Sequence, residues 1–277
     1  LLTLRALPKH SAPQRTFVAF GDPLFNKEQA ADAAKAAPAT VAQRGIAHRS
    51  APRAAANYSA ELADLPRLPD TAEEVLSIAN VLHADPSKDV FLQAKASEAT
   101  VRKLDLSQWR VVMFATHGLI PGDLTGLDQP ALALSVPEVT GESGTGLLTM
   151  ERIMRLKLNA DWVVLSACNT AAGEGAGGDA VAGLGRAFFY AGARSLLVSN
   201  WPVESTSARM LTTELFRSQA DDPKLSRAEA LRLAMLRLID SPGPTVDGKE
   251  LFSYAHPSFW APFSLVGDGA GSMAAAD

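Results

Sequence analysis

The sequence of 277 residues contains a single cysteine, Cys168, so it cannot form an internal disulfide. An unpaired cysteine is typical of a reducing compartment, and we expect a cytoplasmic protein. No run approaches the roughly 20 consecutive apolar residues that a membrane-spanning helix needs. Charged residues make up 20% of the chain and the net charge is −4, so no basic field indicates nucleic acid binding.

Several common binding motifs are also missing. The five histidines are scattered, whereas a metal site needs clustered ligands, and we predict neither a metal nor another cofactor. The glycine-rich stretch 173–178 lacks both the Gly-Lys-Ser/Thr ending of a phosphate loop and the spacing of a dinucleotide-binding motif. We interpret it as a flexible wall of a substrate groove. Ser166 does not lie in a Gly-x-Ser-x-Gly motif, which argues against an α/β-hydrolase.

Apolar segments alternate with amphipathic ones along most of the chain. We predict strands at 16–20, 89–92, 109–116, 131–135, 161–166, 194–199 and 261–266, and helices at 70–84, 97–104, 148–156, 179–191, 205–216 and 227–239. Strands that are apolar throughout and alternate with helices are typical of a largely parallel sheet covered on both faces. The alanine-rich segment 26–68 has weak periodicity, and we interpret it as a variable surface excursion.

Two of the apolar runs end in reactive side chains. One run ends at His117 and the other at Cys168. Loops at the carboxyl ends of parallel strands meet at one edge of the sheet, and histidine supplies the base that a thiol nucleophile requires. Each residue alone has an ordinary structural explanation, as a buried cysteine or as a histidine bonded to a carbonyl. Their occurrence at two matching strand ends favours a catalytic pair.

The two residues lie within segments that together resemble the CHAT domain, a bacterial caspase-like family in the same clan as caspases, separases and gingipains. The matching residues are 21–23, 68–71, 74–75, 115–118, 130–132, 146–149, 163–170, 177–179, 183–184, 199–203, 256–260, 263 and 266–268. His117 precedes Cys168 by 51 positions, close to the separation of about 50 residues in caspases, although the caspase cysteine motif itself is absent. Asn200 departs from the family pattern, where leucine is expected.

The resemblance implies a caspase-like three-layer α/β sandwich with a mostly parallel central sheet and helices on both faces. It implies a peptidase domain at 16–268, preceded by an extension at 1–15 and followed by a flexible tail at 269–277. CHAT domains commonly follow tetratricopeptide repeats or other sensor regions. Because the chain starts at Leu1 rather than methionine, we expect such an upstream region. The glycine-rich loop after Cys168 is of a kind that is easily ordered or displaced, so we also expect an activating partner.

The resemblance also implies a cysteine endopeptidase that acts on protein or peptide substrates. Cys168 would attack the peptide carbonyl and form a thioester, and His117 would act as general base and then as general acid. The backbone N–H groups of Gly118 and Cys168 would form the oxyanion hole, because glycine lets the main chain approach closely. No third catalytic residue is evident from the sequence.

Three further residues are candidates for substrate binding. Asp179 and Glu204 are acids that would hold a basic P1 side chain, as in separase-like and gingipain-like relatives. The alternatives are a helix-capping Asp179 and a solvated Glu204. Trp201 would line or support the groove, with core packing as its alternative. For the whole chain, the alternatives are a catalytically silent scaffold or interaction module, and a zymogen whose site is ordered only when a partner binds.

Overall fold

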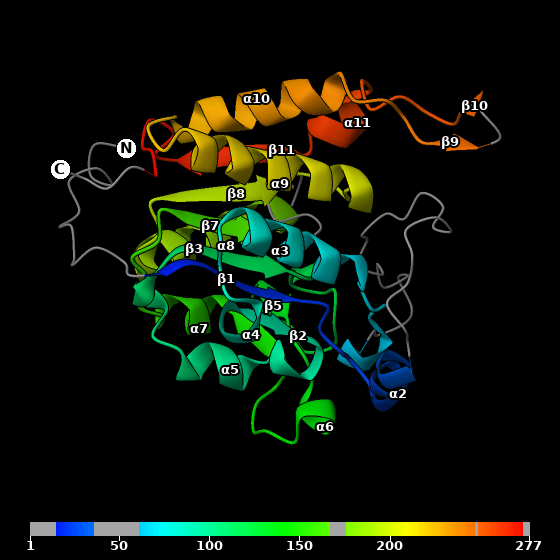
Figure 1. The fold of residues 1–277 in the computed structure, drawn as a ribbon. Coiled ribbons are helices and arrows are strands. Elements are labelled where there is room, and N and C mark those ends of the chain that lie inside the picture. The colour runs from blue at the N-terminus through cyan, green and yellow to red at the C-terminus, as the bar shows by residue number, and fades with distance from the viewer. Residues whose placement is uncertain (1–14, 36–60, 167–175, 247–248, 274–277) are drawn as a thin grey trace.

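The computed structural model describes residues 15–35, 61–166, 176–246 and 249–273, except for the side chains of 176–182 and 246. At its centre is a six-stranded sheet in the order β11-β8-β7-β3-β1-β2 (Figure 1). The strands are β1 (Arg15–Gly21), β2 (Val90–Leu92), β3 (Trp109–Ala115), β7 (Trp162–Leu165), β8 (Ser195–Ser199) and β11 (Phe263–Gly267). All pair in parallel except β11, which runs antiparallel to β8 at one edge.

The central strands are apolar on both faces because helices cover both faces. In β1, Phe17 and Ala19 belong to one core cluster, whereas Val18 and Phe20 belong to the other. Successive side chains of a strand point to opposite faces, so a strand buried on both sides loses the apolar–polar alternation of a half-exposed strand. The fully buried side chains in this strand confirm the prediction of a parallel sheet within an α/β fold.

The helices form two layers that enclose the sheet (Figure 1). One layer contains α3, α9, α10 and α11, and the other contains α5, α7 and α8. Their bounds are α3 (Asp70–Val81), α5 (Glu98–Lys103), α7 (Met150–Met154), α8 (Ala176–Ala191), α9 (Ser205–Asp221), α10 (Arg227–Ile239) and α11 (Pro257–Trp260). Within the described ranges, no helix combines the length and apolar character needed to cross a bilayer.

Two smaller sheets and several short helices lie outside the six-stranded sheet and its main helices. A three-stranded antiparallel sheet contains β4, β5 and β6, and a separate hairpin contains β9 and β10. The short strands are β4 (Gly118–Leu119), β5 (Ala131–Ala133), β6 (Leu147–Thr149), β9 (Thr245–Val246) and β10 (Lys249–Glu250). The remaining helices are α2 (Lys27–Lys35), α4 (Pro86–Asp89) and α6 (Pro137–Thr140), with 3₁₀ turns η2 (Leu62–Asp64), η3 (Gln93–Lys95) and η4 (Leu106–Gln108).

Most predicted elements are confirmed, with ends that shift by a few residues. The helix expected from residue 179 starts at Ala176, so part of the glycine-rich stretch is helical rather than a loop. The helix expected to end at 216 continues to Asp221. The loop after His117 contains β4, which was not predicted because two residues carry no periodicity. The domain limits remain predictions.

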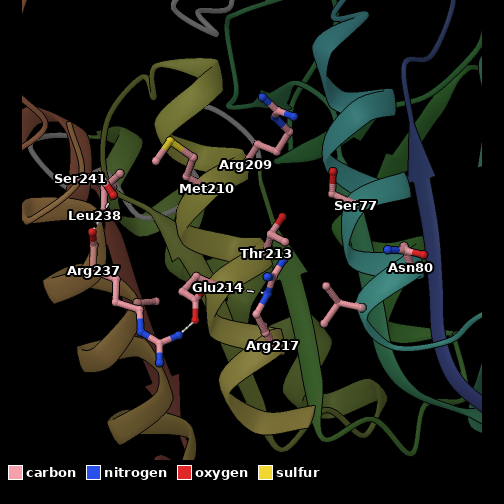
Figure 2. Close-up of a pocket in the computed structure, with 12 residues that line it drawn as sticks. Ser77, Asn80, Arg209, Met210, Thr213, Glu214, Arg217, Arg237, Leu238 and Ser241 are labelled. Atoms are coloured by element: carbon pink, nitrogen blue, oxygen red, sulfur yellow. Dashed lines mark hydrogen bonds and ion pairs between the residues drawn. The ribbon is translucent and has the colours of Figure 1, made fainter. Parts of the chain in front are cut away.

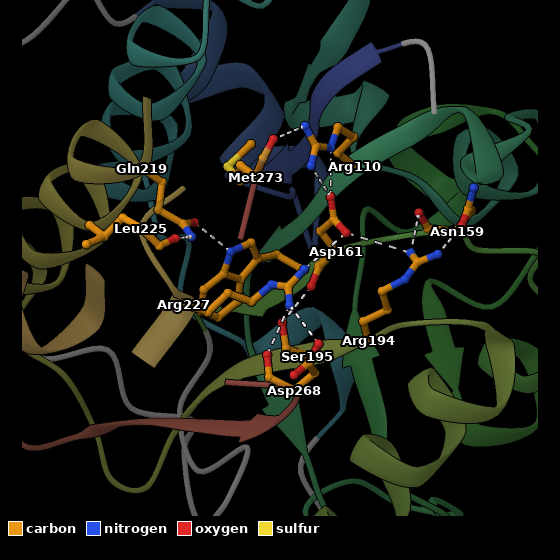
Figure 3. Close-up of polar contacts among 11 residues, drawn as sticks. Arg110, Asn159, Asp161, Arg194, Ser195, Gln219, Leu225, Arg227, Asp268 and Met273 are labelled. Carbon is orange, nitrogen blue, oxygen red and sulfur yellow. Dashed lines mark hydrogen bonds and ion pairs between the residues drawn. The ribbon is translucent and has the colours of Figure 1, made fainter. Parts of the chain in front are cut away.

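An ionic cluster around Asp161 joins the sheet to α10 at the amino end of β7 (Figure 3). Asp161 Oδ2 accepts a hydrogen bond of 2.7 Å from Arg110 Nε, and Asp161 Oδ1 accepts one of 3.0 Å from Arg227 Nη2. Arg194 Nη1 lies 3.8 Å from Oδ1. The side chain of Arg227 is only 2% exposed, and burial lowers the pKa of its guanidinium from the usual value. Asp161 is therefore the main counter-charge for a buried arginine.

The same cluster fixes the end of the described chain. Arg227 Nη1 donates a hydrogen bond of 3.0 Å to the carbonyl oxygen of Asp268, and its backbone N–H donates to the carbonyl of Gly271. Arg110 Nη1 donates to the carbonyl of Met273, whose side chain is buried in the core (Figure 3). These contacts attach the segment that follows β11, as far as Met273, to Arg110 at the amino end of β3 and to Arg227 at the start of α10.

Candidate functional site

The sequence predicts a site at the carboxyl edge of the parallel strands, and the structure describes the part of this edge that carries His117. Gly21 at the end of β1 pairs with Ala115 at the end of β3, and Leu165 at the end of β7 pairs with Val198 in β8. The four strands therefore end at nearly the same level. His117 follows β3 by two residues at this edge.

His117 is completely buried, and contacts with two described residues, Phe25 and Pro66, hold its ring. Its ring packs against Phe25, with ring centroids 5.6 Å apart. Its Nε2 lies 2.7 Å from the carbonyl oxygen of Pro66. A carbonyl oxygen can only accept, so Nε2 carries a proton in this contact. In the neutral ring, Nδ1 is then the basic nitrogen.

The Pro66 carbonyl is a partner that the sequence did not reveal, because it comes from a segment 51 residues away and uses no side chain. The next residue, Arg67, forms a two-pronged ion pair with Asp22 at the end of β1. Arg67 Nε donates to Asp22 Oδ1 at 2.8 Å, and Nη2 donates to Oδ2 at 2.6 Å. The backbone N–H of Asp22 also donates a hydrogen bond of 2.7 Å to Thr71 Oγ1. The pair thus fastens the Pro66 segment to the sheet beside His117.

Replacing Arg67 with methionine is expected to make stability depend more steeply on pH. Burial raises the pKa of Asp22 above its usual value, and the contact with Arg67 offsets part of that rise. A carboxyl group whose pKa is higher in the folded than in the unfolded protein stabilises the fold while it is protonated. This stabilisation is complete below the pKa of the unfolded state and is lost as pH rises through the pKa of the folded state. Arg67→Met raises the pKa further, so we expect a loss on the order of 2–3 kcal/mol at pH 8 and a smaller loss at pH 4.

Urea unfolding of the native protein and the variant at both pH values measures this difference. The double variant Arg67→Met/Asp22→Asn is the matched control, because it removes the titrating carboxyl and should abolish the extra pH dependence. An equal loss at pH 4 and pH 8 in Arg67→Met would contradict the assigned role of the pair.

The backbone at Gly118 is oriented by the β4–β5 ladder. Ala133 N donates to the carbonyl of His117 at 2.9 Å, and Gly118 stands opposite Leu132. Hydrogen-bonded and non-hydrogen-bonded pairs alternate along an antiparallel ladder. The pair of Gly118 and Leu132 is consequently the non-hydrogen-bonded kind, so the N–H of Gly118 points away from β5. This is the orientation that an oxyanion donor at Gly118 requires.

A buried carboxyl group lies beneath the site. Ser166 Oγ donates to both oxygens of Glu74, at 2.9 and 3.0 Å, and Thr212 Oγ1 donates to Glu74 Oε1 at 3.0 Å. All three residues are fully buried. Glu74 lies close to the first turn of α3, and its buried side chain joins α3 to Ser166 after β7 and to α9. The sequence showed only an acidic residue in a first helical turn, so the partners in distant elements were not predictable.

Cys168, the predicted nucleophile, lies outside the described residues, as do residues 173–175 of the glycine-rich stretch. Ser166, the last described residue before it, donates its backbone N–H to the carbonyl of Phe114 at 3.0 Å. This bond extends the pairing of β7 with β3 by one residue toward the edge at which His117 lies. Asp179 belongs to α8, and its side chain is likewise outside the described part of the structure.

Glu204 and Trp201 lie between β8 and α9. Glu204 is the N-cap of α9, and its oxygens accept from the backbone N–H groups of Thr206 at 2.9 Å and Ser207 at 2.7 Å. Its side chain is buried, so the alternative of a solvated Glu204 is wrong. Trp201 is 39% exposed, which excludes the alternative of plain core packing.

Asn200, the departure from the family pattern, ties this loop to β11. Its Nδ2 lies 2.8 Å from both the carbonyl oxygen of Pro262 and Ser264 Oγ. Its backbone N–H also donates to Pro262. These hydrogen bonds hold the segment bearing Trp201. Across the described ranges, no group of three or more His, Cys, Asp or Glu side chains is arranged to hold a metal ion.

The parallel sheet between two helical layers, with a buried histidine after β3, defines a caspase-like α/β protein. The chain belongs to the CHAT domain family, whose model matches residues 2–268 and thus nearly the whole sequence. It is also similar to tetratricopeptide repeat protein 28 of Mus musculus and of Homo sapiens, in each case 33% identical over 123 residues. That match covers 44% of this chain but only 4% of each relative. The likeness extends to mammalian proteins, so it is not confined to bacteria.

Proposed function

We propose that the protein is a cysteine endopeptidase with Cys168 as nucleophile and His117 as its acid–base partner. The thiol gives its proton to His117, and the sulfur forms a bond to the peptide carbonyl carbon. Collapse of the tetrahedral intermediate breaks the C–N bond, His117 returns the proton to the leaving amine, and a thioester remains. Water, deprotonated by His117, then attacks the thioester and releases the acid product and the thiol.

The observation that carries this proposal is the setting of His117. A histidine whose Nε2 is bonded to the Pro66 carbonyl at 2.7 Å is fixed in one ring orientation, with Nδ1 as its basic nitrogen. A base held in this manner, with its ring packed on Phe25, suits repeated proton transfer at one position better than a mobile side chain does. The Pro66 carbonyl would also stabilise the imidazolium that forms when His117 takes the thiol proton.

Charge on the tetrahedral intermediate would be stabilised by the backbone N–H groups of Gly118 and Cys168. The orientation of Gly118 in β4, with its N–H directed away from β5, supports this assignment. The absence of a side chain at Gly118 leaves room for the substrate carbonyl. Loss of one such donor typically costs about 3 kcal/mol of transition-state stabilisation.

Substrate recognition would involve Trp201 and, for a basic P1 side chain, Asp179 or Glu204. The exposed indole of Trp201 offers an apolar surface beside the predicted groove. The carboxylate of Glu204 already accepts two backbone N–H bonds from α9, so a lysine or arginine would have to share it. Asp179 is therefore the preferred candidate for the P1 contact.

A panel of fluorogenic peptides that differ only at P1 tests both the activity and the preference. We expect cleavage after arginine or lysine, and a fall of about tenfold or more in kcat/KM for these substrates in Asp179→Asn. Glu204→Gln serves as the comparison, because its amide oxygen can still cap α9. We expect this variant to lower kcat/KM for basic P1 substrates less than Asp179→Asn does. Preference for aspartate at P1 would refute the basic pocket, and absence of cleavage with every peptide would favour the non-catalytic scaffold.

We further propose that the domain works with a tetratricopeptide-repeat or sensor region as its regulatory partner and acts in the cytoplasm. Its relatives in mouse and human carry the tetratricopeptide repeat in their names. A single cysteine that serves as nucleophile must stay reduced, which suits a cytoplasmic setting. Activity that rises when such a region is supplied would support the partnership, and an unchanged rate would count against it.

A further inference from the structure

A second concave region lies away from the carboxyl edge of the sheet, between α3, α9 and α10 (Figure 2). It is a cavity of about 420 Å³, within the range typical of small-molecule sites. The residues that line it are Ser77, Asn80, Val81, Arg209, Met210, Thr213, Glu214, Arg217, Ala234, Arg237, Leu238 and Ser241. Neither His117 nor any other residue assigned to the peptidase site is among them.

The lining of this pocket carries an excess of two positive charges. Arg209, Arg217 and Arg237 face only one acid, Glu214. Glu214 is engaged by Arg237 across the gap between α9 and α10, and it lies 3.9 Å from Arg217 Nε (Figure 2). The contact between Glu214 and Arg217 is long, and the side chain of Arg217 is 54% exposed. This ion pair therefore contributes little to stability, and Arg217 can exchange it for a bound anion. Arg209 has no ion pair with any of the described residues.

A hydroxyl group in the same pocket lacks a partner. Thr213 Oγ1 is buried, yet no hydrogen bond to it exists within the described residues. Thr213 lies four residues after Arg209 and four before Arg217 on α9, so the three side chains project from one face of the helix over about 12 Å. A buried hydroxyl without a partner is costly, and a bound acceptor would remove that cost. The two arginines flank the place where such an acceptor would lie.

We propose that this pocket binds a phosphorylated small molecule, with phosphoryl oxygens held by Arg209 and Arg217 and accepting a hydrogen bond from Thr213. Guanidinium groups pair with phosphate oxygens in a two-pronged geometry, and phosphate oxygens accept from hydroxyls. Two arginines eight residues apart suit a ligand with two or more linked phosphoryl groups. The site is independent of the peptidase activity proposed above.

The rest of the lining suits the non-phosphate part of such a ligand. Val81, Met210 and Leu238 offer apolar contact area, and Ser77 and Asn80 on α3 offer polar groups. Most of the lining residues are polar or charged, so the pocket is more polar than a typical small-molecule site, which suits a phosphorylated ligand.

Isothermal titration of the purified chain with pyrophosphate and with ATP tests the proposal. We expect both probes to bind, and binding to weaken by about tenfold or more in Arg209→Gln and severalfold in Thr213→Val, which is nearly isosteric. Arg232→Gln is the matched control: it removes an exposed arginine of α10 outside the pocket and should change affinity less than twofold. Affinity should fall with rising salt.

Three outcomes would overturn the proposal. One is absence of binding by either probe at millimolar concentration. Another is binding that Arg209→Gln and Thr213→Val leave as tight as in the native protein. The third is tighter binding of a phosphate-free oligoglutamate peptide than of either probe, which would assign the pocket to acidic peptides. Circular dichroism of each variant establishes that the fold persists, and peptide cleavage is not needed as a readout.

Discussion

Cys168→Ala should reduce peptide hydrolysis by on the order of 10⁴-fold or more, since removal of the nucleophile from a concerted catalytic unit eliminates the covalent route. The substitution deletes one sulfur atom and leaves the backbone N–H of the predicted oxyanion hole in place. We therefore expect the far-ultraviolet circular dichroism and the thermal midpoint to stay close to those of the native protein. Steady-state cleavage of the best peptide of the P1 panel measures the loss.

A companion variant tests whether Cys168 and His117 act as one unit. His117→Ala should lose nearly as much activity, and the double variant should be no worse than either single one, because residues of a catalytic unit are strongly non-additive. His256→Ala is the control, since His256 is an exposed cap of α11 and lies outside the site. Additive losses in the double variant would show that the two residues act separately.

Asp161→Ala should lower the free energy of unfolding by about 3–5 kcal/mol, the usual result of removing one partner from a buried ion pair. The substitution leaves the guanidinium of Arg227, whose side chain is 2% exposed, without its main counter-charge. It also removes the acceptor for Arg110 (Figure 3). Asp268 retains only a longer contact with Arg227, at 3.4 Å, and cannot compensate for both losses.

Equilibrium unfolding in urea measures this loss through the midpoint at constant slope. Asp32→Ala is the matched control: Asp32 lies on α2 with a side chain that is 70% exposed, and its ion pair with Lys35 is 3.9 Å long. We expect the control to change stability by less than about 0.5 kcal/mol. A loss below about 1 kcal/mol in Asp161→Ala would show that the cluster at the amino end of β7 adds little to the fold.

The sequence predicted the features that depend on local patterns. The strands that end before His117 and Cys168 were predictable because each is a continuous apolar run, which a parallel sheet buried on both faces requires. The matching ends of β3 and β7 follow from that topology and not from any single motif. Membership of the CHAT family, expected from the motifs, is confirmed over residues 2–268.

The contacts that hold the site were not predictable, because they join segments that are far apart in the chain. The bond from His117 to Pro66 uses a backbone carbonyl, which leaves no trace in residue type. Glu74 looked like an acid at the start of a helix, yet it is fully buried and bonded to Ser166, 92 residues later. Glu204 was predicted as an acid that could hold a basic P1 side chain, and in the structure its side chain caps α9.

The central claim is that His117 activates the thiol of Cys168, and covalent labelling tests it most directly. The protein is treated with a peptidyl acyloxymethyl ketone across pH 5–9, and the adduct is followed by intact mass. Because the chain has one cysteine, a single added mass identifies the labelled sulfur. We expect one adduct, formed much faster than with a free thiol, at a rate that falls sharply in His117→Ala. Labelling at the rate of an ordinary cysteine, unaffected by His117→Ala, would contradict it.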